Sequence, residues 1–283
     1  MRRFGDRPDG EKIRNLDSMH YIMPLVFPNR CDNEAFMTLN IELDKIEKFI
    51  EEQNKGKSEE EKYTLFGILI AALIKVVHKR PQLNRFIANK NIYQRNHVSA
   101  AFIVKKSLSD YSEETMARIV GEKEDTLESI KDQVNYQIKK CRTESDETTD
   151  AMNFIQKLPL KGLIGLLARW ADKRGLMPQS VIATDPYQCT VVLTNLGSIG
   201  LNVGYHHLMN WGTNSIFVVV GQKKYVPIYD RNGNVKMKKV LPLSFTVDER
   251  ISDGYYFGKS LRLLKRLCEN PELLMDKFVD EDD

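Results

Sequence analysis

The sequence predicts an α/β (α+β) protein built mainly as one domain. Apolar residues alternate along 37–43 and 241–247, which predicts half-buried strands. Apolar residues recur at helical spacing within 65–77 and 257–267, which predicts helices that pack on those strands. The length of 283 residues is enough for one large domain or two small ones.

The first residues differ from the rest of the chain. They are polar and are interrupted by prolines around one apolar patch at 21–27. We therefore assign residues 1–32 to an N-terminal arm that docks on another surface. No internal repeat or low-complexity linker divides the remainder, so residues 33–283 are assigned to a single domain.

The first half of that domain should alternate strands with helices. The strand at 37–43 is followed by a helix that includes Ile46, and Thr64 is a suitable N-cap for a helix that ends before Pro81. The elements expected next are strands near Ile92 and at 98–104, then helices at 122–140 and at 160–174, the last closed by Gly175.

The last hundred residues are richer in strands. Asn232 and Gly233 separate two β-rich runs and predict a tight hairpin. The expected strands lie at 190–193, 216–220, 225–229 and 235–240, before the alternating run at 241–247. A helix should begin after Gly254 and end before Pro271.

Composition gives little reason to expect a macromolecular partner other than the protein itself. The 42 basic and 39 acidic side chains leave a net charge of +3, so neither nucleic acid nor a membrane is expected as a partner. The apolar run at 66–77 contains Lys75 and is too short to span a bilayer. The N-terminus has no apolar core of the kind found in signal peptides, so we expect a cytoplasmic protein.

The cysteines do not indicate a metal site or a disulfide framework. They are isolated from one another and from histidines at metal-ligand spacing, and we expect reduced, structural thiols and no metal. The four positions are Cys31, Cys141, Cys189 and Cys268.

The strongest candidate for chemistry is the run from Asp248 to Gly254, Asp-Glu-Arg-Ile-Ser-Asp-Gly. It joins the strand at 241–247 to the following helix, and such junctions often display catalytic side chains on a rigid support. Glu249 and Asp253 are the candidate catalytic acids, with Arg250 between them. The alternative is an ordinary solvated turn.

A second candidate is the strand end that contains Thr194 and Asn195, followed by Leu196 and Gly197. Both side chains can donate hydrogen bonds, and such donors can stabilise an oxyanion. The alternative is ordinary turn chemistry at a strand end.

Several other patterns are weaker. The run that begins with His206 and His207 superficially resembles a His-His-x-x-x-Asp-Gly motif, but Trp211 occupies the Asp position. We therefore expect a loop or interface role there. The glycines at 197, 200 and 204 do not have the spacing of a dinucleotide-binding loop. Neither a Gly-x-Ser-x-Gly motif nor a P-loop is present, which argues against α/β-hydrolases and NTPases.

Read in order, the C-terminal motifs resemble the catalytic domain of the dihydrolipoyl acyltransferase component of 2-oxo acid dehydrogenase complexes. Residues 194–197 resemble that family's Ser-Asn-Leu-Gly strand end. Residues 241–254 resemble its final strand and its Asp-His-Arg-x-x-Asp-Gly turn, and 261–275 resemble its closing helix and tail. The resemblance extends from about Phe36 to Met275.

This resemblance implies a chloramphenicol acetyltransferase-like fold, a two-layer arrangement of a mixed sheet and helices, assembled as a homotrimer. It implies active sites at subunit interfaces, where coenzyme A or acetyl-CoA is a substrate and a small-molecule acceptor enters from the other side. In such sites a His removes the thiol proton. By position, Thr194 would stabilise the oxyanion, Asp253 would hold the turn, and Arg30 would pair with that Asp.

The sequence departs from the family pattern in two ways. No lipoyl domain and no Ala/Pro-rich linker are visible, so we expect a stand-alone protein without a lipoyl group of its own. The position of the catalytic His is occupied by Glu249.

A carboxylate is a weaker base than an imidazole toward a thiol. Transfer of a proton from a thiol costs roughly 5.7 kcal/mol with an ordinary Glu and about 2.7 kcal/mol with His. Burial or nearby acids can raise a carboxyl pKa by about 2 units, which would remove that handicap. Pairing with Arg250 would have the opposite effect.

Two functional hypotheses therefore remain. The first is a CoA-dependent acyltransferase that acts on a thiol, amine or hydroxyl with Glu249 as an atypical base. The second is a catalytically inactive relative that serves as a trimeric ligand-binding or assembly protein.

Overall fold

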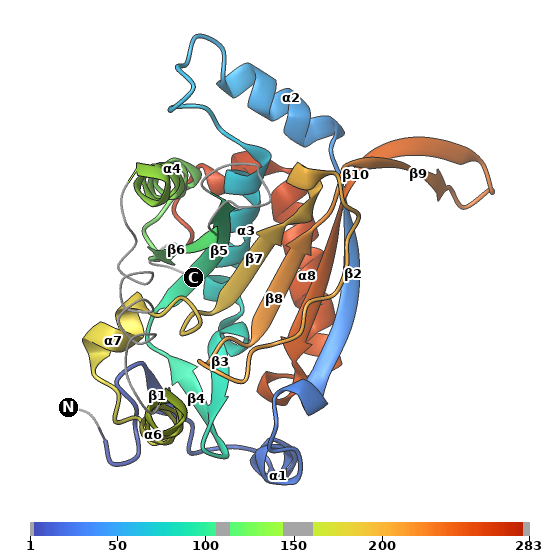
Figure 1. Cartoon of the computed structure of the whole chain (residues 1–283). Helices are drawn as coiled ribbons and strands as arrows, with labels where there is room; N and C mark the ends of the chain where they lie inside the picture. The colour runs from blue at the N-terminus through green and yellow to red at the C-terminus, as the bar shows by residue number, and fades with distance from the viewer. Residues whose placement is uncertain (1–2, 106–113, 144–160, 280–283) are drawn as a thin grey trace.

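A mixed sheet forms the centre of the molecule (Figure 1). The computed structural model describes residues 3–105, 114–143 and 161–279. The sheet order is β2-β10-β8-β7-β5-β6, with β7 parallel to both β5 and β8 and the other pairs antiparallel. The strands are β2 (Glu34–Glu42), β5 (Val98–Lys105), β6 (Glu114–Gly121), β7 (Val191–Asn195), β8 (Ile216–Val220) and β10 (Val235–Asp248). A mixed sheet was implied by the resemblance and is confirmed.

Helices cover one face of the sheet (Figure 1). They are α3 (Leu65–Lys79), α4 (Leu127–Thr143) and α8 (Gly254–Glu269), and they share the main apolar core with the sheet. The Thr64 side chain caps α3 by accepting a hydrogen bond of 3.0 Å from the Gly67 N–H, as predicted. On the other face the extended chain at 201–214 crosses the strands and packs on a smaller apolar cluster around Phe217.

A long hairpin projects from the upper end of the sheet (Figure 1). It consists of β9 (Lys224–Tyr229) and the first half of β10, and Gly233 in its turn has a φ of 83°. The predicted hairpin is confirmed. Beside it lies α2 (Asp44–Gln53), whose Glu47 pairs with Lys223 and Lys239 at the base of the hairpin.

The N-terminal residues are integrated with the rest of the chain. β1 (Gly10–Lys12) joins an antiparallel sheet with β4 (Asn91–Arg95) and β3 (Arg85–Ala88), and α1 (Ser18–Val26) packs near the end of β10. The arm therefore docks on its own chain. Other short elements are η1 (Cys31–Asn33), η2 (Pro81–Asn84), η3 (Leu196–Ile199), η4 (Glu249–Ile251), η5 (Pro271–Leu274), α6 (Lys161–Lys173) and α7 (Gln179–Thr184).

The structure differs from the sequence prediction in some elements. The helix expected from residue 122 begins at Leu127, because Asp125 and Thr126 are used in the turn before it. β1, α1, β3, β6 and α7 were not predicted. The predicted strands at 37–43, 98–104 and 216–220 are confirmed, as is the helix that follows Asp253.

A buried polar network fixes the N-terminal residues. Arg7 donates to Asp9 over 2.8 Å and to the Asp172 carboxylate over 3.0 Å, and Arg95 lies 3.9 Å from Asp9. Gly175 comes close to Arg7, since a Cβ at this positive-φ position would lie 2.9 Å from the Arg7 Cγ. The network ties β1 to α6 although they are far apart in sequence.

The cysteines and acidic groups show no cofactor site among the residues described. No cluster of three or more His, Cys, Asp or Glu suited to a metal occurs there. Cys31 is exposed, whereas Cys141, Cys189 and Cys268 are buried. Burial raises the pKa of the Cys189 thiol to about 11, so it remains protonated at neutral pH. None of the described helices has the length and apolar character needed to cross a bilayer.

Replacement of Arg7 should destabilise the fold strongly. Arg7→Ala leaves Asp9 and Asp172 buried without their main cation, and we expect a loss of about 3–5 kcal/mol in the free energy of unfolding. Urea denaturation measures this loss. The control Arg14→Ala removes a more exposed ion pair with Asp6 and should cost about 1 kcal/mol or less. Equal losses in the two variants would contradict the role of Arg7.

Candidate active site

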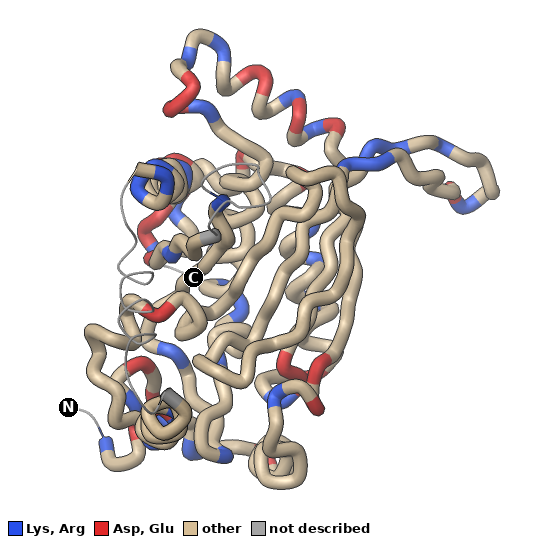
Figure 2. Tube along the Cα trace, in the orientation of Figure 1, with Lys and Arg blue, Asp and Glu red and all other residues tan. Residues whose placement is uncertain are grey.

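The run predicted to carry chemistry forms a strand–turn–helix junction. β10 ends at Asp248, η4 follows, and Asp253 precedes the first residue of α8. This junction lies at the lower end of the sheet, where acidic residues gather near the ends of β2 and β10 (Figure 2). The local structure predicted for the run is confirmed.

The Asp248 carboxylate is the buried centre of this junction. It has no exposed surface and accepts two hydrogen bonds from Arg250, of 2.8 Å from Nε and 2.6 Å from Nη2. It also accepts from the Arg250 backbone N–H over 3.2 Å, which shapes the turn. A bidentate arginine–carboxylate contact of this kind fixes orientation as well as charge.

Arg30 supplies a second cation to the same carboxylate. Its Nε lies 3.8 Å from the Asp248 Oδ2, and its other nitrogens donate to the carbonyls of Met209 and Gly212. Burial lowers the pKa of the Arg30 guanidinium, and attraction to Asp248 opposes that shift. Arg250 in turn donates to the Phe27 carbonyl over 2.9 Å. The two arginines therefore connect the turn to the N-terminal residues and to the crossing chain.

Glu249 is not part of this network. Its side chain is exposed, and none of the hydrogen bonds or ion pairs among the described residues involves its carboxylate. The pairing of Arg250 with Glu249, considered from the sequence, is wrong because Arg250 pairs with Asp248. Glu249 is therefore not neutralised by its neighbour in the chain.

The role expected for Asp253 needs correction. Its exposed carboxylate accepts a hydrogen bond of 2.7 Å from the Tyr256 N–H and so caps α8. Arg30 pairs with Asp248, and the expected pair with Asp253 is not formed. Asp253 still supports the turn, but as a helix cap.

The two residues of the second candidate, at the end of β7, face opposite sides of the sheet. Val191 and Leu193 belong to the core on the helix side, whereas Val192 packs on the opposite side. By the same alternation, Asn195 faces the helices and the half-buried Thr194 faces the crossing chain. The two donors predicted together therefore cannot serve one pocket on the same face.

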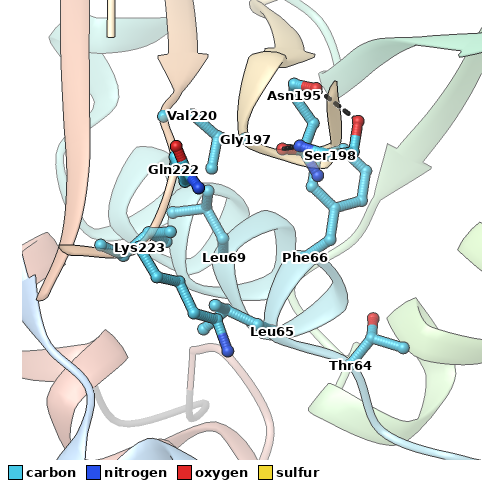
Figure 3. A pocket seen from close by; sticks show the side chains of 12 residues that line it. Thr64, Leu65, Phe66, Leu69, Asn195, Gly197, Ser198, Val220, Gln222 and Lys223 are labelled. Atoms are coloured by element: carbon cyan, nitrogen blue, oxygen red, sulfur yellow. Dashed lines mark hydrogen bonds between the residues drawn. The ribbon is translucent and has the colours of Figure 1, made fainter. Parts of the chain in front are cut away.

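A cavity of about 510 Å³ opens beside Asn195, at the upper ends of β7 and β8 (Figure 3). The Asn195 side chain accepts from the Ser198 N–H over 3.2 Å and so holds the turn at its rim. Gly197 is required there because a Cβ would lie 2.5 Å from the Gly221 carbonyl oxygen. Phe66 and Leu69 of α3 form an apolar wall, and Lys223 lies at the opening.

Thr194 and Glu249 lie at opposite ends of the sheet in one copy of the chain. Val247 of β10 is level with Ile216 of β8, which is level with Val191 of β7. Thr194 lies beyond this level in one direction and Glu249 in the other, which separates them by about 17 Å along the strands and about 10 Å across. They cannot act on the same reacting group within one copy.

The two adjacent histidines have structural contacts. The His206 ring stacks on Phe217 with centroids 4.1 Å apart, and the nearby Trp211 donates to Asp185 over 2.6 Å. These residues lie in a loop, as predicted. Sequence reasoning missed Asp248 as the partner of both arginines, although its place at the end of an alternating strand was visible.

The fold is chloramphenicol acetyltransferase-like. Residues 155–276 match the model of the 2-oxoacid dehydrogenases acyltransferase family (catalytic domain), which is 122 of the 283 residues. The match covers less than half of the chain, and the predicted resemblance to that family is confirmed. No match was found among curated proteins.

Solved structures share the fold over almost the whole chain. A dihydrolipoamide acetyltransferase from Azotobacter vinelandii matches with a TM-score of 0.60 and 16% identity, covering 93% of this chain and 94% of that one. A probable dihydrolipoamide acetyltransferase from Listeria monocytogenes matches with a TM-score of 0.59 and 16% identity, covering 92% of this chain and 95% of that one. A chloramphenicol acetyltransferase matches with a TM-score of 0.55 and 11% identity, covering 92% of this chain and 99% of that one. The predicted chloramphenicol acetyltransferase-like fold is confirmed.

Asp248, and not Asp253, should control the stability of the turn. Asp248→Asn leaves Arg30 and Arg250 buried without an anion, and we expect a loss of about 3–5 kcal/mol in the free energy of unfolding. Asp253→Ala removes a helix cap and should cost about 1 kcal/mol. Urea denaturation compares the two, and a larger loss in Asp253→Ala would contradict this assignment.

Proposed function

We propose that the protein is a CoA-dependent acyltransferase whose active site is completed between two copies of the chain. Glu249 of one copy acts as the general base, and Thr194 of the next copy stabilises the oxyanion. The observation that carries the proposal is the placement of these two residues at opposite ends of one sheet. A contact between the lower end of one copy and the upper end of another would bring them together.

Apolar surfaces at both ends of the sheet support such a contact. α1 lies against η4 at the lower end, and most of its large apolar side chains are exposed. At the upper end, the hairpin register places five apolar residues on one exposed face: Tyr225, Pro227, Tyr229, Val235 and Met237. A two-stranded hairpin is marginally stable alone in water, so this face favours a partner.

A contact between unlike ends can close into a ring. Such contacts generate either closed rings or open filaments, and closure with three copies gives the homotrimer that the family resemblance implies. Each copy would then contribute its lower end to one active site and its upper end to another. Three equivalent sites would result.

The exposed Glu249 is suited to a base that functions at an interface. Asp248 pairs with both Arg250 and Arg30, and none of the ion pairs among the described residues involves the Glu249 carboxylate. A carboxylate covered by a neighbouring copy becomes a stronger base, since burial disfavours its charged form. The base would accept a proton from the acceptor thiol, amine or hydroxyl as that group attacks the acyl-CoA carbonyl. The bond between the acyl carbon and the sulfur would then break, and coenzyme A would leave as the thiol after it receives the proton from Glu249.

The cavity at the upper end has a suitable size for part of an acyl-CoA. Its volume of about 510 Å³ lies within the range of about 300–1,000 Å³ typical of small-molecule sites. Its lining combines an apolar wall from Phe66 with polar groups of Asn195 and Ser198. We place there the part of coenzyme A or acetyl-CoA that is remote from the thioester, because Thr194 lies on the other face of β7 and does not line the cavity. A small-molecule acceptor would enter from the side of the neighbouring copy's Glu249.

The base assignment predicts a specific loss of activity. With acetyl-CoA and a panel of thiol, amine and hydroxyl acceptors, Glu249→Gln should lower the turnover by about 10²–10⁴. The matched control Glu272→Gln changes another exposed acid and should leave turnover unchanged. Activity that appears only in Glu249→His would instead indicate a catalytically inactive relative in its natural form.

Mixing two inactive variants tests whether the site is shared. Glu249→Gln and Thr194→Ala, unfolded and reassembled together in equal amounts, should recover about one quarter of the parent activity, because that fraction of sites receives both intact residues. The control mixes Glu249→Gln with the double variant and should recover none. Absence of recovery in verified mixed oligomers would place the two residues in different sites.

A further inference from the structure

α6 is apolar on two sides. Ile164, Ala168 and Ala171 face the protein body, while a second set of large apolar side chains faces outward. This outward set, Leu163, Leu166, Leu167 and Trp170, is 53, 66, 54 and 49% exposed, respectively. The spacing of these four residues over two turns places them on one continuous stripe. Such a helix is normally covered on both sides.

The charges beside this stripe are all positive. Arg169 and Lys173 are exposed and one turn apart, so they border the stripe together. Arg174 follows the helix, with its guanidinium 4.5 Å from the Trp170 ring centre. The acid of this helix, Asp172, is buried and pairs with Arg7. The exposed surface therefore combines leucines, a tryptophan and cations.

The buried contacts fix the direction in which the stripe points. Asp172 accepts from Arg7 over 3.0 Å and from Gln188 over 3.0 Å. These contacts hold one side of α6 on the body, so the stripe cannot rotate inward to be buried there. The apolar surface is thus presented outward in a defined orientation.

We propose that α6 binds the protein to an anionic lipid surface. Helices that lie in a membrane interface combine an apolar stripe of Leu and Trp with flanking Lys and Arg, as α6 does. Its 13 residues span about 20 Å, too short to cross a hydrocarbon layer of about 30 Å but long enough to lie along one. Arg169, Lys173 and Arg174 would contact lipid phosphates while Leu166, Leu167 and Trp170 enter the apolar boundary.

A lipid surface suits α6 better than a second copy of the chain does. Cores of protein interfaces are depleted in charged residues, and lysine is depleted across such interfaces generally. Here Arg169 and Lys173 border one side of the stripe toward the C-terminal end of α6, and no exposed acid of α6 balances them. The whole-chain charge of +3 gave no reason to expect a membrane, because that total hides this local arrangement.

Vesicle sedimentation of the full chain tests the proposal. We expect binding to vesicles of phosphatidylcholine with phosphatidylglycerol, much weaker binding to phosphatidylcholine alone, and release by salt. Arg169→Gln and Lys173→Gln should each lower the partition coefficient about fivefold, whereas Lys48→Gln on α2 should not change it. Leu166→Glu should abolish binding, whereas Tyr255→Glu on α8 should retain it.

Trp170 provides a direct reporter of insertion. In a Trp211→Phe background, its emission should shift to shorter wavelength when anionic vesicles are added. Absence of binding, or equal losses in the α6 variants and their controls, would overturn the proposal. It would also be overturned if Leu166→Glu dissociated the oligomer but left vesicle binding intact, because α6 would then be a contact between copies.

Discussion

The contact between Asp248 and two arginines determines the geometry of the candidate active site. One fully buried carboxylate joins the end of β10 to Arg250 and Arg30. Arg250 extends the contact to Phe27, and Arg30 extends it to the crossing chain at Met209. A buried cation without its anion is costly, so these segments are held together by their contacts with one carboxylate. Glu249 projects from the turn that these contacts fix.

The arrangement of the strands places the two candidate residues of the proposed site at opposite ends of one copy of the chain. β7 and β10 run in opposite directions within the sheet, so residues near their C-terminal ends lie at opposite ends of the sheet. Thr194, near the end of β7, therefore lies at the upper end, and Glu249, directly after β10, lies at the lower end. A shared site between copies reconciles this separation with the family resemblance. The exposed apolar faces of α1 and the hairpin are consistent with that assembly.

Patterns that depend on neighbouring residues were predicted well. The alternation along 241–247, the Asn232–Gly233 turn and the Thr194–Gly197 strand end each follow from local sterics and burial. β1 and α1 were missed because their structure depends on distant partners. β1 has three residues and gains its hydrogen bonds from β4. Its position is fixed by Arg7, which pairs with Asp172 across 165 residues of sequence.

The sequence by itself determined the strand–turn–helix junction, the carboxylate at position 249 and the ordered motifs that resemble an acyltransferase domain. These features are local, so short-range spacing is enough to predict them. Only the tertiary structure decided that Asp248 takes both arginines and that Asp253 caps a helix. It also decided that Thr194 and Asn195 face opposite sides of the sheet and that Glu249 lies at the end of the sheet remote from Thr194. Strand order and burial set these outcomes, and both depend on contacts between residues remote in sequence.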